Sequence, residues 1–253
     1  MSTTVRDRSE RREQATRGFG WRRLQVGAAA AAIAAFVAPM LLTLSFEGFL
    51  IAMTVPLVVG LLVLWRWPRV GAIWLGVVSL ALLGTSAPFL VDALAHPESI
   101  ADFVPLSAFT LATLIGVVAA IPSLRQGRGP DSPSSSAKRV GVAATGLFAA
   151  AVVVSVVAFT GIESIPARAD DIQIVTSDLR FEPAAIEADG GTISVHVTNR
   201  DSTRHTFTVD ELGVDLSIPP DSAQRVTFMA EAGTYRFYCR PHAPGMEGHL
   251  IVA

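Results

Sequence analysis

Five long stretches without a charged residue or a histidine constrain the fold of this 253-residue chain more than any other feature. A helix needs roughly 20 apolar residues to cross the hydrocarbon core of a bilayer. Buried helices of a soluble protein would show polar faces at a 3.6-residue period, which these stretches lack. The sequence therefore predicts five transmembrane helices, at residues 24–46, 48–65, 70–91, 103–124 and 140–162.

Positive charges occur in the connections that lie on one side of the predicted membrane. The segment 1–23 contains seven arginines, and the connections after the second and fourth stretches also carry Lys or Arg. The connections after the first and third stretches carry acidic residues and no Lys or Arg. Because Lys and Arg accumulate in cytoplasmic loops, we expect a basic cytoplasmic leader at 1–23 and a four-span region at 24–124 in the cell membrane. Five crossings then place the chain after residue 162 outside the cytoplasm.

The C-terminal half of the chain has a different composition and a different pattern of apolar and polar residues. The segment 125–139 is rich in Ser, Pro and Gly, and it predicts a cytoplasmic linker before the fifth helix at 140–162. From 170 to 253, short apolar–polar alternations are separated by Gly and Pro, as in half-buried strands joined by turns. They predict an extracytoplasmic all-β sandwich or barrel, with strands at 172–176, 192–198, 205–209, 225–229, 234–239 and 248–252.

This β-type segment is acidic. From residue 169 onward it contains 13 acidic and 6 basic residues, a net charge of −7. Because nucleic-acid binding depends on cations that contact phosphates, we expect no nucleic-acid partner. Complementary charge favours protein partners that present a basic surface.

The single cysteine of the chain has neighbours that are typical of a metal site. Cys239, His242 and Met246 fall within eight residues, in a turn-rich loop. Two imidazoles, a thiolate and a weak axial thioether are the ligands of an electron-transfer copper site, and we expect His205 to supply the second imidazole. A buried apolar thiol, an exposed His205, a core Met246 and a zinc site are the alternatives. Strand alternation places His196, by contrast, toward solvent.

Three motifs make residues 170–253 resemble a cupredoxin of the plastocyanin, pseudoazurin and amicyanin type. They are F-E-P-A-A-I at 181–186, V-T-N-R-D-S-T-R-H-T-F at 197–207 and G-T-Y-R-F-Y-C-R-P-H-A-P-G-M-E-G-H-L-I-V at 233–252. The resemblance implies a Greek-key sandwich that holds one type 1 (blue) copper ion per chain. Transferred position by position, the resemblance implies three equatorial copper ligands, which are His205, Cys239 and His242. It implies that Met246 is the axial ligand.

Two positions differ from the family pattern. Three residues separate His242 from Met246, one fewer than in plastocyanin-like proteins and one more than in amicyanin-like ones. Thr206 follows the first histidine where many relatives carry Asn. We expect this second change to alter the usual hydrogen bond to the region of the cysteine.

These features favour an electron carrier over an enzyme. A copper site of this type has no open position for a substrate, the C-x-x-C-H motif of a c-type haem is absent, and the spans hold no ionisable residue for transport. The sequence predicts a membrane-anchored blue copper protein that carries single electrons between extracytoplasmic redox proteins, with the lipid bilayer as its other partner. Copper capture, sensing or delivery without electron transfer is one alternative. A function of the four-span region itself, with the copper domain as its regulator or electron donor, is another.

Overall fold

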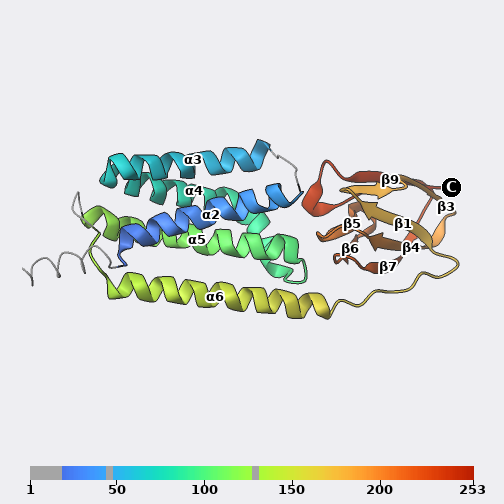
Figure 1. Cartoon of the computed structure of the whole chain (residues 1–253). Helices are drawn as coiled ribbons and strands as arrows, with labels where there is room; N and C mark the ends of the chain where they lie inside the picture. Colours follow the sequence, from blue (N-terminus) through green and yellow to red (C-terminus); the bar gives the residue numbers. More distant parts are fainter. Residues whose placement is uncertain (1–18, 44–47, 127–130) are drawn as a thin grey trace, which may run out of the picture. The chain divides into compact units, whose positions relative to one another are not determined.

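The computed structural model describes residues 19–43, 48–126 and 131–253, so the predictions for 1–18, 44–47 and 127–130 lie outside the described residues. The chain divides into two compact units (Figure 1). The helical unit contains the residues up to Val91 together with Val104–Val152. The β unit contains Asp92–Phe103 and Val153–Ala253.

The N-terminal region is helical, as predicted, and its helices run side by side (Figure 1). Four helices in the described residues are long and apolar enough to span a bilayer, namely α2, α4, α5 and α6. The apolar stretch of α3, Ile51–Arg66, is shorter, so the fifth crossing remains a prediction. The bounds are α2 Trp21–Thr43, α3 Gly48–Arg66, α4 Pro68–Ala95, α5 Ile100–Arg125 and α6 Ser135–Thr160.

The helices of the helical unit are apolar both inside and outside. The rings of Phe36 and Phe109 contact each other inside, with centroids 4.6 Å apart. The buried side chain of Gln25 donates a hydrogen bond from Nε2 to the carbonyl oxygen of Ala72 at 3.0 Å. Large apolar side chains such as Leu62 nevertheless stay exposed on the outer faces. Apolar surface of this extent is typical of helices that face lipid.

The β unit contains two sheets that form a sandwich, as the sequence predicts. The four-stranded sheet has the order β2-β1-β4-β7 and the five-stranded sheet the order β3-β9-β8-β5-β6. Neighbouring strands are antiparallel except for β1 with β4 and β3 with β9, which are parallel. The bounds are β1 Ile172–Ser177, β2 Arg180–Glu182, β3 Ala185–Ala188, β4 Gly191–Asn199, β5 His205–Val209, β6 Val214–Ile218, β7 Ala223–Ala230, β8 Gly233–Tyr238 and β9 Glu247–Val252.

Three phenylalanines fill the core between the two sheets. Phe181 stands edge-on to Phe207 and to Phe237, with ring centroids 6.4 and 5.1 Å apart. Such edge-to-face pairs add stability beyond the burial of apolar area. A glycine in β9 permits this packing, because a Cβ at Gly248 would lie 2.3 Å from the Phe237 ring and 2.4 Å from the carbonyl oxygen of Ala184.

All six predicted strands exist, and the structure adds β2, β3 and β6. The orientation predicted for His196 is wrong: its side chain is buried, and its Nε2 donates to the carbonyl oxygen of Ile165 at 2.8 Å. The segment that follows α6 covers this face of β4, where Ile165 N–H donates to the carbonyl oxygen of Ala223. Alternation identified the two faces of the strand but not the cover that a distant segment provides.

Candidate metal centre

The predicted ligands come together at one end of the five-stranded sheet. His205 is the first residue of β5, and Cys239 follows the last residue of β8. Strands β8 and β9 pair as far as Tyr238 and Glu247, so residues 239–246 form the loop between them. Backbone hydrogen bonds hold this loop together, including Cys239 N–H to the carbonyl oxygen of Met246 and Gly245 N–H to that of His242.

Three ligand atoms form a compact triangle. The sulfur of Cys239 lies 3.5 Å from Nδ1 of His205 and 3.3 Å from Nδ1 of His242. The two Nδ1 atoms are 3.2 Å apart. These three residues form a group whose atoms could together hold a metal ion.

The size of the triangle fits a metal ion. Its centre lies about 1.9 Å from each atom, close to the roughly 2.0–2.3 Å that zinc, for instance, keeps from imidazole nitrogen and thiolate sulfur. One thiolate and two imidazoles in a trigonal arrangement suit copper. Cys239 and His205 are fully buried, whereas His242 is partly exposed.

Burial also determines the charge of these groups. It raises the pKa of the Cys239 thiol and lowers the pKa of His205. Burial, assisted by the neighbouring His205, lowers the pKa of His242 to about 4. Both imidazoles are therefore neutral at neutral pH, each with one nitrogen lone pair for a metal, while the thiol must lose its proton when a metal binds.

Met246, the predicted axial ligand, is buried at the end of the same loop. It is 1% exposed and belongs to the apolar core that also contains Cys239. Its N–H donates to the carbonyl oxygen of His242 at 3.2 Å, and its carbonyl oxygen accepts from Cys239 N–H at 3.0 Å. The role of its sulfur as a ligand remains a prediction.

Residues 147–252 match the family model of the cupredoxin-like domain. The C-terminal part of the chain is a cupredoxin-like domain. The resemblance seen in the sequence is thereby confirmed.

Solved structures of amicyanin variants are similar to 34% of this chain, and the match covers 86% of each amicyanin chain. A reduced variant is 22% identical, a variant in its reduced Cu(I) form 24% and an oxidized variant 21%, each with a TM-score of 0.30.

Sequence reasoning missed one residue of the cupredoxin-like site, Asp201. Its Oδ2 lies 2.8 Å from Nε2 of His205. The carboxylate also accepts backbone N–H bonds from Asp178 at 2.9 Å and Leu179 at 3.3 Å, in the turn between β1 and β2. Because the carboxylate accepts a hydrogen bond from Nε2, the proton of the neutral ring stays on Nε2, and the lone pair of His205 Nδ1 faces the triangle. The four-residue spacing between Asp201 and His205, in a turn that enters a strand, was the available signal.

Thr206 provides the link to the cysteine region that the sequence left in question. Its hydroxyl accepts a hydrogen bond from the N–H of Arg240 at 2.8 Å. Its own N–H points to the sulfur of Cys239 at 3.4 Å. The hydrogen bond that we expected to change is therefore made by a threonine hydroxyl, and β5 stays connected to the metal loop.

Arg204 precedes the first ligand and is itself buried. Its guanidinium binds the carboxylate of Asp92 at 2.7 and 2.5 Å, within the same β unit. Its N–H donates to the hydroxyl of Ser99 at 3.2 Å. These contacts satisfy a buried charge and fix the backbone where β5 begins.

Proposed function

We propose that this chain is a membrane-anchored type 1 blue copper protein that carries single electrons between extracytoplasmic redox proteins. The buried triangle of one sulfur and two imidazole nitrogens carries this proposal, with edges of 3.2 to 3.5 Å. His205, Cys239 and His242 would hold the ion, and Met246 would be the axial ligand. Copper bound there would supply a one-electron redox couple.

The protein contributes a fixed and dry set of ligands. β5 and the loop after β8 hold His205 and Cys239 at 0% exposure, so solvent does not contact them. Asp201 holds the ring of His205 in one orientation through the 2.8 Å hydrogen bond. A ligand frame that does not rearrange between oxidation states favours rapid electron transfer. With His205, Cys239, His242 and Met246 as ligands, a bound copper ion would have no open position for a substrate, which supports a carrier rather than an enzyme.

His242 is the proposed exit for the electron. It is the one ligand of the triangle with an exposed edge. The exposed residues beside it, Ala243, Pro244 and Gly245, carry no charge and allow a partner to approach closely. The acidic character of the domain favours a partner whose contact rim is basic.

Membrane anchoring is part of the same proposal. Four candidate spans in the described residues support it, and the distribution of Lys and Arg supports a cytoplasmic N-terminus. With α3 as the fifth crossing, the copper domain would be extracytoplasmic. Fusing a reporter enzyme that is active only outside the cytoplasm to Ala253 tests this: activity is expected, and an inactive fusion that is present in the membrane contradicts it.

The electron-transfer proposal is tested by voltammetry on the full chain, purified in detergent and loaded with copper. A reversible one-electron wave is expected, together with retention of copper against a chelator through repeated cycles. The variant Cys239→Ser should lose the wave. The variant His249→Ala, which removes an exposed histidine outside the site, should keep it.

Copper capture or delivery predicts a different result. A delivery site must release its ion, so rapid loss of copper to the chelator without a reversible wave would favour that function over electron transfer. The full burial of Cys239 and His205 disfavours fast release.

A further inference from the structure

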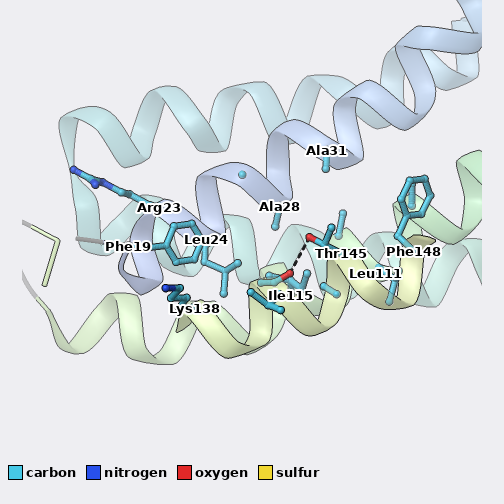
Figure 2. A pocket seen from close by; sticks show the side chains of 16 residues that line it. Phe19, Arg23, Leu24, Ala28, Ala31, Leu111, Ile115, Lys138, Thr145 and Phe148 are labelled. Atoms are coloured by element: carbon cyan, nitrogen blue, oxygen red, sulfur yellow. Dashed lines mark hydrogen bonds between the residues drawn. The ribbon is translucent and has the colours of Figure 1, made fainter. Parts of the chain in front are cut away.

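The helical unit contains a large cavity that the copper site does not use. It lies between α2, α5 and α6 and has a volume of about 880 Å³ (Figure 2). This volume lies within the 300–1,000 Å³ that is usual for small-molecule sites. The cavity is only partly enclosed, so an occupant can enter from the surroundings of the helices.

Small side chains create this cavity. α2 contributes Gly27, Ala28 and Ala31, and α5 contributes Ala108 and Ala112. These residues recur at helical spacing, so each helix presents a shallow face where larger side chains would have filled the space. An empty apolar space forfeits the dispersion contacts of its lining. Flexible hydrocarbon chains match such a trough in shape and polarity.

The charges of the lining lie at one end. Among the described residues that line the cavity, Arg23 and Lys138 are the charged ones. Figure 2 shows both at the end marked by Phe19, with Phe148 farther along. The nearby carboxylate of Asp131 accepts N–H bonds from the first turn of α2, including that of Arg23 at 2.9 Å.

Deeper in the cavity, the lining does not favour a polar ligand. The hydroxyl of Thr145 donates to the carbonyl oxygen of Gly141 at 3.0 Å, within its own helix. The remaining side chains along the trough are apolar. An occupant should therefore have an anionic head at one end and a long apolar body, without polar groups along its length.

We propose that this cavity binds one anionic phospholipid of the bilayer, with the phosphate at the end that carries Arg23 and Lys138 and an acyl chain along the alanines of α2 and α5. Basic pockets between membrane helices bind acidic lipid headgroups in this way. The long stems of Arg and Lys let their charges reach the headgroup layer while the helices stay in hydrocarbon. The proposal rests on the membrane location proposed above and not on copper binding.

Native mass spectrometry of the full chain in detergent tests this, with phosphatidylglycerol and phosphatidylcholine of identical acyl chains as probes. Retention of one phosphatidylglycerol is expected, at least about tenfold above phosphatidylcholine. The double variant Arg23→Gln/Lys138→Gln should remove this preference. The matched control Arg66→Gln/Arg69→Gln, which neutralises two exposed cations outside the cavity, should keep it.

A second variant tests the contribution of the apolar lining independently of the two cations. Ala31→Leu adds a side chain to the lining and should lower retention while both cations remain; helical circular dichroism checks that it folds. Equal retention of the two lipids, an unchanged preference in the double variant, or a quinone at the site would overturn the proposal. Cys239→Ser should retain lipid as wild type does, so failure of the copper proposal leaves this result intact.

Discussion

Replacing Asp201 with Asn should raise the reduction potential of the copper-loaded protein. The Asp201 carboxylate lies 2.8 Å from Nε2 of His205, on the far side of the ring from the proposed metal position. Its negative charge would stabilise Cu(II) more than Cu(I), because Cu(II) carries the larger positive charge. Asparagine keeps one carbonyl oxygen that can accept a hydrogen bond from Nε2, while its NH2 group loses the bond from Asp178 N–H. The substitution therefore removes the charge and keeps the hydrogen bond to the ring.

The structure sets the size of this effect. A unit charge across one imidazole ring lies roughly 7 Å from the redox centre and interacts with it by about 2 kcal/mol at an effective dielectric constant of about 20. For a one-electron couple this corresponds to about 100 mV. Because 18% of the Asp201 side chain is exposed, solvent and salt screen the charge, and we expect a rise of about 50 mV.

Voltammetry of the copper-loaded full chain measures this shift. The variant Asp189→Asn makes the same charge change at the other end of the domain, beside Gly190, whose N–H binds the carbonyl oxygen of Ala253. This control should leave the potential nearly unchanged. An unchanged or lower reduction potential in Asp201→Asn would refute the reasoning. An equal rise in Asp189→Asn would also refute it, because the shift would then depend on the net charge of the protein and not on the position of Asp201.

Three further substitutions test the packing and electrostatics of the cupredoxin-like domain. Gly248→Ala should destabilise it by about 1–3 kcal/mol in urea unfolding followed by circular dichroism, because the new Cβ would lie 2.3 Å from the Phe237 ring; unchanged stability would contradict this packing. Leu179→Gly should stabilise it by about 0.5–1 kcal/mol in the same assay, since Leu179 has φ of 58°, and a loss of stability would count against strain there. Asp210→Asn should lower the pKa of Tyr238, measured by titrating the absorbance of the phenolate. The reason is that the Asp210 carboxylate accepts a hydrogen bond from the Tyr238 hydroxyl at 2.9 Å and raises that pKa. An unchanged titration curve would show that this hydrogen bond does not form in solution.

The sequence predicted the parts of the fold in which local pattern and tertiary environment agree. Alternating residues located the long strands of the sandwich, and uncharged stretches located the helices. The three-residue β2 is too short to show a period, and β6 lies just before the paired prolines at 219–220. His196 was misplaced because a segment about 30 residues upstream covers its face of the sheet.

The site shows the same division. The spacing of Cys239, His242 and Met246 is a local property, so the sequence displays it directly. The four-residue spacing between Asp201 and His205 is visible in the sequence, but it does not assign the role of Asp201, because that role depends on the β1–β2 turn, which presents the N–H groups of Asp178 and Leu179 to the carboxylate. Contacts between a turn and a ligand of another strand leave no periodic signal in a single sequence.

Titration of the full chain with Cu(II) tests the central claim most directly. If His205, Cys239 and His242 hold a type 1 centre, the solution should turn intensely blue and saturate at one copper per chain, because a thiolate bound to Cu(II) gives strong visible charge-transfer absorption. The colour should vanish in Cys239→Ser and persist in His249→Ala. Copper that binds without colour, or a colour that survives the loss of Cys239, would contradict the account.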